Sequence, residues 1–205
     1  MMLSASEAHA SVSFAVDTDR LVTRAELVLR ATALDSYAAW EGTRIVTYSK
    51  LHVDETIAGS TKDSEVWVRS LGGQVDHLGQ WVDGEPVFNQ GQSSLVFLSK
   101  DEGGAYVSVA RAQGQIPLSF DAKKKTWLAK PNPYIGMLVP RPETTLPSAT
   151  NSVQTTSTNS ASTSVKPLAS VAPRSLRPAV DELSGKSLDE LRSDLSARWG
   201  KAHRP

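Results

Sequence analysis

The strongest candidate for chemistry is a histidine in a glycine-rich stretch at residues 72–84. His77 follows Asp76 directly, and an imidazole beside a carboxylate is typical of a general base or a metal ligand. The alternative is a solvent-exposed loop histidine, which the sequence favours because the other three histidines are scattered along the chain, at His9, His52 and His203. A hydrolase or metal-dependent enzyme centred on the Asp76–His77 loop is therefore the less favoured hypothesis.

Other forms of catalysis find little support. The sequence contains no cysteine, which excludes disulfides, thiol catalysis and cysteine-based metal sites. It lacks the Gly-x-Ser-x-Gly nucleophile motif, and its glycine pairs lack the Lys-Ser/Thr that follows a phosphate loop. Acidic pairs such as Asp54–Glu55 are adjacent, so in a strand they point to opposite faces. We therefore predict no catalytic residue, no metal ion, no cofactor and no enzymatic activity.

A set of aromatic residues favours binding instead. Exposed rings stack on sugars or on single-stranded nucleic acid, although core packing and cross-strand pairing are more common roles for them. Nucleic acid also requires an excess of basic residues, whereas 22 Lys and Arg here balance 22 Asp and Glu. We predict no nucleic-acid partner. The candidate ligand surface consists of Trp40, Tyr48, Trp67, His77 and Trp81.

The elements that must position these residues are mostly short β-strands. Residues 44–57 alternate with period two, which places Leu51 on one face and Tyr48 on the other. The turn at residues 40–43 predicts a hairpin with a strand at residues 26–34. A short helix is expected after Asp17, and further strands at residues 65–71, 94–98, 106–110, 115–120 and 126–129. This pattern predicts a mainly β fold, either a small OB-like closed barrel or a sandwich.

Composition divides the chain into four parts. The triplet Ala8-His9-Ala10 has the small-x-small pattern that signal peptidase recognises, so residues 1–10 are interpreted as the remnant of a signal peptide whose start lies upstream of Met1. Residues 11–140 form the predicted β-barrel-like domain, which we expect to fold alone. Residues 141–180 are predicted to be a disordered Ser/Thr/Pro-rich linker, since 13 of the 22 residues from 144 to 165 are Ser or Thr and none is charged.

The last part, residues 181–205, carries a clear helix signal. Ser187 and Glu190 have the spacing of a capping box, and Gly200 suits a C-terminal cap. One apolar stripe follows at helical spacing, formed by Leu188, Leu191, Leu195 and Trp199. A single stripe is marginal alone, so the helix is expected to recruit a protein partner or to dock on its own barrel. No apolar run is long enough to span a membrane.

Several motifs, in order, resemble an uncharacterised family of exported bacterial β-domains. The similarity covers residues 17–120 and rests on AELVLRAT at 25–32, WEGTRIVT at 40–47, LGG at 71–73, GEPVF at 84–88, LVFL at 95–98 and AQG at 112–114. Members usually begin with a signal peptide, so the resemblance implies a location in the periplasm, at the cell surface or outside the cell. The layout also resembles the OB-type barrel of netrin-like modules. No activity is implied.

The sequence therefore favours a non-enzymatic, extracytoplasmic module that binds a ligand or another protein, the latter through the C-terminal helix or the barrel loops. Two alternatives stay open. One is the enzyme centred on the Asp76–His77 loop. The other is an inhibitor-like structural domain whose exposed loops enter a partner's cleft.

Overall fold

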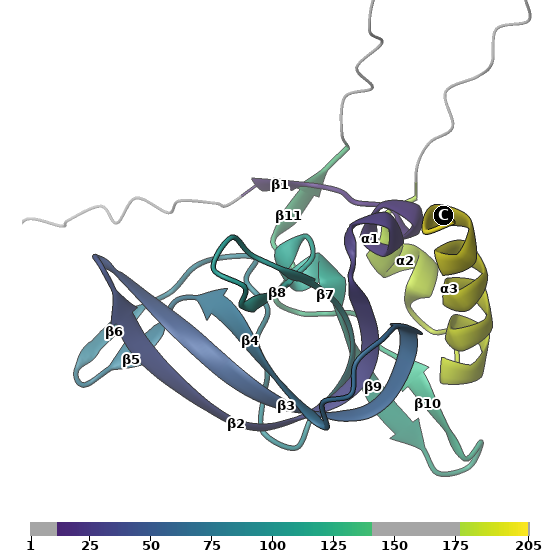
Figure 1. Ribbon diagram of the computed structural model, residues 1–205, viewed down its shortest axis with the longest axis horizontal. Coiled ribbons are helices and arrows are strands. Elements are labelled where there is room, and N and C mark those ends of the chain that lie inside the picture. Colours follow the sequence, from purple (N-terminus) through teal and green to yellow (C-terminus); the bar gives the residue numbers. More distant parts are fainter. Residues whose placement is uncertain (1–11, 141–176, 205) are drawn as a thin grey trace, which may run out of the picture. The chain divides into compact units, whose positions relative to one another are not determined.

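The structure is a computed structural model that describes residues 12–140 and 177–204. These two stretches belong to one compact unit. It is mainly β, with a short N-terminal helix and two C-terminal helices (Figure 1). Of the linker predicted at residues 141–180, residues 141–176 lie outside the described residues. Its last two residues, 179 and 180, belong to a helix, α2 (Ala179–Leu183), so the prediction is wrong there.

A closed barrel of the OB type forms the centre of the fold, so the predicted mainly β class is confirmed and the barrel is the one of its two alternatives that the structure adopts. Its strands are β2 (Leu27–Glu41), β3 (Arg44–Gly59), β4 (Glu65–Leu71), β7 (Ser93–Lys100) and β8 (Tyr106–Ser108). β2 pairs antiparallel with β3 and with β7, and β3 pairs antiparallel with β4. The ring closes because β8 runs parallel to β4 on one side and antiparallel to β7 on the other.

Three smaller pairs of strands surround the barrel. β9 (Gln115–Asp121) extends the sheet beyond β7 and is joined by β10 (Thr126–Ala129). β5 (Gly73–Val75) and β6 (Leu78–Gln80) form a hairpin after β4. β1 (Val12–Phe14) and β11 (Met137–Val139) pair in parallel, a contact between the two ends of the first described stretch that the sequence does not predict.

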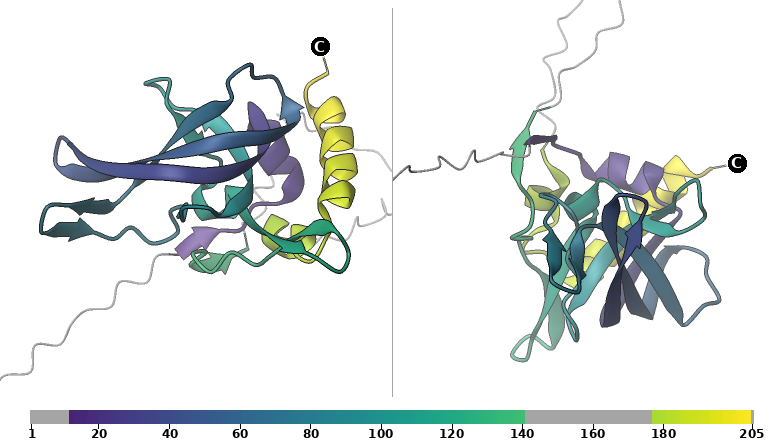
Figure 2. Two further views of the ribbon diagram at one scale, coloured as in Figure 1. Left: turned by 90° about the horizontal axis from the view of Figure 1, so that it is seen from below. Right: turned by 90° about the vertical axis from the view of Figure 1, so that its left-hand side faces the viewer.

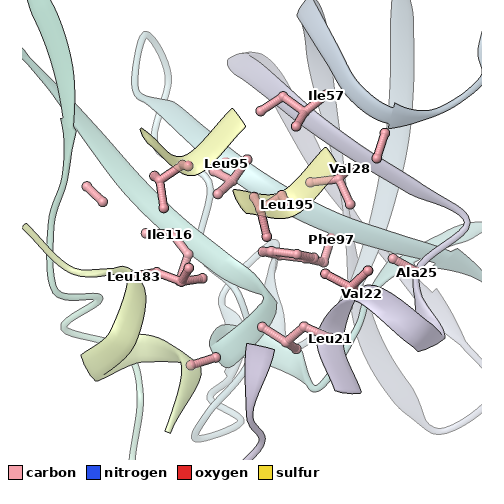
Figure 3. Close-up of a cluster of buried hydrophobic side chains, with 14 of the residues drawn as sticks. Leu21, Val22, Ala25, Val28, Ile57, Leu95, Phe97, Ile116, Leu183 and Leu195 are labelled. Carbon is pink, nitrogen blue, oxygen red and sulfur yellow. The ribbon is translucent and has the colours of Figure 1, made fainter. Parts of the chain in front are cut away.

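Two hydrophobic clusters stabilise this arrangement. The first fills the barrel with residues from its strands, among them Leu29, Leu51, Val68, Val96 and Leu98. The second lies between the sheet and the helices and contains Phe97, which is fully buried (Figure 3). The helices that cover it are α1 (Thr18–Arg24), α2 and α3 (Leu188–Ala202). α3 lies beside α1 in both views of Figure 2.

The capping box at Ser187 and Glu190 is present as predicted. Gly200, however, lies inside α3 instead of ending it, and the helix continues to Ala202 with His203 as its C-cap. The imidazole of His203 stacks on the indole of Trp199, with ring centroids 3.8 Å apart. The helix therefore ends at Ala202, beyond the point that the glycine suggested.

Polar contacts complement the apolar docking of α3. Arg192 binds both carboxylate oxygens of Glu55 on β3, at 2.6 and 3.1 Å. Arg198 pairs with acidic residues on each of the three helices, Asp19, Glu182 and Asp194. Ion pairs to both neighbouring helices and to the sheet fix the register of α3 as well as its position. The prediction that residues 11–140 fold alone is untested, but the core that they form includes side chains from α2 and α3.

Several strand boundaries differ from those that the sequence suggests, among them the ends of β2 and β8. β2 continues to Glu41, seven residues beyond the expected end at residue 34. β8 ends at Ser108, because Ala110 and Arg111 adopt left-handed backbone angles (φ of 56° and 57°) before a short 3-10 helix at Arg111–Gly114. In the described residues, no helix is long and apolar enough to cross a membrane.

Candidate functional site

The long β2–β3 ribbon creates the candidate site because it reaches beyond the barrel. β2 pairs with β7 only from Leu27 to Thr32, so its second half has β3 on one side and leaves its inner face uncovered by the barrel wall. The β5–β6 hairpin and the loop at residues 81–89 lie over this inner face. Between them is a cavity of about 540 Å³, called here the barrel-mouth pocket.

Two glycines allow the chain to form one wall of this pocket. After β4 the backbone turns at Gly72 and Gly73, whose φ values of 91° and 131° are unfavourable for other residues. A Cβ on Gly73 would lie 2.4 Å from Oγ1 of Thr47, so the hairpin can approach the ribbon only with glycine at this position. The side-chain oxygen of Gln80 then accepts a hydrogen bond from the Ile45 backbone N–H at 2.8 Å.

Hydroxyl groups line the floor of the pocket in two cross-strand rows. Ser36 lies opposite Ser49, and Thr47 lies opposite Ser70. Only 3% of Ser49 and 6% of Ser70 are exposed, and both line the cavity. The Thr47 hydroxyl donates to the Gly72 carbonyl at 2.7 Å. Within the described residues, the hydroxyls of the three serines make no hydrogen bond.

The remaining walls are apolar or carry neutral amides. Apolar side chains come from Leu71, Val82, Pro86, Val87 and Phe88, and amides from Gln74, Gln80 and Asn89. Trp81 stands at the rim, 72% exposed. Glu85 is the ionisable side chain of the described lining, and both of its oxygens are engaged, one with the Leu71 N–H at 3.0 Å and the other with Arg111 at 2.9 Å.

The opposite, outer face of the same strands carries an aromatic cluster. Tyr37 stacks on Tyr48 with centroids 5.3 Å apart, and Trp67 meets Tyr37 edge-on at 5.5 Å. Tyr37 is 54% exposed and Trp67 42%. The cluster follows from register, since Tyr37, Tyr48 and Arg69 are direct cross-strand neighbours on β2, β3 and β4.

Two basic residues of this outer face, Arg69 and Lys50, are paired with acidic ones. Glu41 binds Arg69 and also accepts a hydrogen bond from the Tyr48 hydroxyl. The hydrogen bond from Arg69, and then that from Tyr48, lowers the pKa of Glu41, and the same contact raises the pKa of Tyr48. Lys50 lies 5.9 Å from the Trp67 ring centroid and 2.6 Å from Glu65. These pairings neutralise Arg69 and Lys50, which weakens the case for a phosphate ligand on this face.

The aromatic surface predicted from the sequence is therefore divided between two faces. Tyr48 and Trp67 lie together on the outer face, whereas Trp81 lines the pocket on the inner side. Trp40 pairs with Ile45 and so shares the inner side, beyond the pocket. His77 is exposed in the turn of the β5–β6 hairpin, and the described residues contain no cluster of His, Cys, Asp or Glu able to hold a metal ion.

Some functional candidates were not predicted. Tyr37 and Ser36 fall in the part of β2 beyond residue 34, where the expected strand ended. Continuing the period-two pattern of the partner strand through the turn would have paired both residues correctly. The pocket serines, in contrast, carry no signal of their own, because hydroxyl residues in a strand are common.

The predicted partner-binding stripe on α3 faces the protein's own core. Leu188, Leu191 and Leu195 are buried among residues of the sheet and of α1, and Leu195 lies beside Phe97 in Figure 3. Trp199 is partly buried at the edge of the same cluster. The stripe is thus occupied within this chain, and it is not a free surface in the structure.

Comparisons of this chain with known protein families, with curated proteins and with solved structures found no match. The resemblance to exported β-domains and the location outside the cytoplasm stay predictions of the sequence. Any functional proposal therefore rests on the chemistry of the pocket and of the outer face.

Proposed function

We propose that this protein is a non-enzymatic binding module that holds a small ligand in the barrel-mouth pocket. The observation that carries the proposal is the pair Ser49 and Ser70, which are more than nine-tenths buried, line the cavity and have no hydrogen-bond partner within the described residues. Both hydroxyls face the cavity, so they are available to donate hydrogen bonds to a ligand that enters and to accept hydrogen bonds from it.

The size and composition of the pocket support binding. Small-molecule sites typically enclose roughly 300–1,000 Å³ and combine apolar walls with a few placed polar groups. The barrel-mouth pocket has about 540 Å³ and the same mixture. Proton transfer needs an ionisable group free to exchange its proton, whereas the carboxylate of Glu85 is held by a backbone N–H and by Arg111. The lining therefore favours reversible binding over catalysis.

Protein interaction is the second candidate function, and the outer aromatic cluster favours it. Tyrosine and tryptophan are enriched at protein interfaces, and Tyr37 and Trp67 are about half exposed on the barrel surface. This surface is separate from the pocket, so both functions can coexist. Substituting Trp67 tests the second function without altering the first.

The proposal is tested by NMR on the isotopically labelled full-length protein. A panel of hexoses, amino acids, nucleosides and phosphate esters is added, and the amide signals of Gly72, Gly73 and the Trp81 indole are followed. At least one compound should shift these signals saturably. Ser70→Val should weaken that binding, and the matched change Ser119→Val, at an exposed position on β9, should not. Unchanged pocket signals across the panel in the folded protein would contradict the proposal.

A further inference from the structure

We infer that the ligand of the barrel-mouth pocket is a neutral saccharide, bound with a ring face against Trp81 and with its hydroxyls on Ser49 and Ser70. The inference rests on the proposed function and specifies the class of ligand. It follows from three properties of the pocket, namely its charge, the type of its hydrogen-bonding groups and the position of its aromatic side chain.

The charge of the lining excludes ionic ligands. Among the described lining residues no lysine, arginine or histidine is present, so a phosphate or carboxylate would lose its hydration without gaining a counter-charge. Glu85 is the negative group of the lining, and its pairing with Arg111 at 2.9 Å already satisfies it. A cationic ligand would have to compete with that arginine. The pocket therefore selects a neutral molecule.

The hydrogen-bonding groups match a ligand that is rich in hydroxyls. A serine hydroxyl both donates and accepts, so it pairs equally well with another hydroxyl in either direction. Ser36 and Ser49 lie opposite each other on β2 and β3, and Ser70 lies on β4 in the next row. Adjacent strands are about 4.8 Å apart, so these hydroxyls are spaced across a surface that one sugar ring covers.

The aromatic side chain at the rim provides the remaining contact. Trp81 is 72% exposed and borders the cavity, so its side chain is accessible to a ligand that enters. A pyranose ring has an apolar face of C–H groups and an edge of hydroxyls. The first packs on an indole, while the second reaches the serines. A purely apolar ligand would leave Ser49 and Ser70 unsatisfied.

The test is a titration of the full-length protein with glucose, N-acetylglucosamine, maltose and cellobiose, with adenosine as a neutral aromatic comparison. Binding is followed by NMR at the Trp81 indole and at Gly72 and Gly73. We expect at least one sugar to bind with a Kd below about 10 mM, in the weak range where 1 mM corresponds to about 4.1 kcal/mol. Trp81→Ala should weaken binding at least about tenfold, or about 1.4 kcal/mol.

The control is Trp67→Ala on the outer face, which should change the sugar affinity less than about twofold. Because Trp81 is largely exposed, the Trp81→Ala variant should still give the amide spectrum of a folded protein. If no sugar binds but adenosine or another compound shifts the pocket signals, the saccharide inference is overturned and the proposed function stands. If Trp67→Ala rather than Trp81→Ala abolishes sugar binding, the inference is also wrong. If no compound moves the pocket signals, both proposals fail.

Discussion

Truncating either central leucine of α3 should destabilise the whole protein. Leu191 and Leu195 are fully buried, and their neighbours come from the sheet and from the two other helices, so the cavity left by alanine cannot close by a local shift. Substitutions of this type cost about 2–5 kcal/mol. Domains of this size are stable by roughly 5–15 kcal/mol in total. Each change should therefore remove a large part of the stability, and the double variant should be close to unfolded.

Urea unfolding of the full-length protein, followed by circular dichroism, measures this loss. Ser193→Ala is the matched control on the exposed side of the same helix, and it should change the free energy of unfolding by less than about 0.5 kcal/mol. We expect a lower midpoint with an unchanged slope, because the helix unfolds together with the barrel. A loss below about 1 kcal/mol for both leucine variants would show that α3 is not part of the core in solution.

Two further predictions concern the ribbon and the helix contacts. In urea unfolding, Gly73→Ala should lower the free energy of unfolding by about 1–3 kcal/mol more than Gly91→Ala. Both glycines have positive φ, but only a Cβ at Gly73 would meet a neighbour, at 2.4 Å. Equal losses of stability in the two variants would contradict the close approach of the hairpin to the ribbon. Burial raises the pKa of Asp194, but hydrogen bonding to Arg198 and the charges of Arg198 and Lys186 outweigh it and lower this pKa below 3.8. Its stabilisation is thus present above pH 3.8 and lost as the pH falls through the lower folded value. Asp194→Asn should accordingly destabilise the protein less in acid than at neutral pH. If the difference in free energy of unfolding between the wild type and this variant is the same at neutral pH and below pH 3.8, the prediction is wrong.

The barrel could be predicted because its signals are local. β4 and β10 begin and end where the alternation of residues 65–71 and 126–129 indicates, and α1 begins after its Asp17 cap. The closure of the ring could not be predicted in the same way. The sequence predicts a strand at residues 106–110, but it does not predict that β8 pairs with β4, because this parallel pairing joins segments far apart in the chain.

The site could be predicted only in part, because it too depends on contacts between residues that are far apart in the sequence. Aromatic residues are easily recognised in a sequence, so Trp67 and Trp81 are candidates. That they lie on opposite faces depends on the register of β3 and β4 and on the turn of the chain after β4. Ser49 and Ser70 are candidates because they line the cavity and their hydroxyls have no hydrogen-bond partner within the described residues. The lining of a cavity is a property of the folded chain and has no signature in the residue type.

The contacts with α3 and the barrel-mouth pocket lie at opposite ends of one strand. On β3, Glu55 and Ile57 contact α3, whereas Thr47 and Ser49 line the pocket. Glu55 lies six positions after Ser49, which at about 3.3 Å per residue is roughly 20 Å of extended chain. The helices therefore complete the apolar core at one end, and they leave the other end open. This division leaves the hydroxyls of Ser49 and Ser70 facing the cavity, while the apolar packing where α3 docks stabilises the fold.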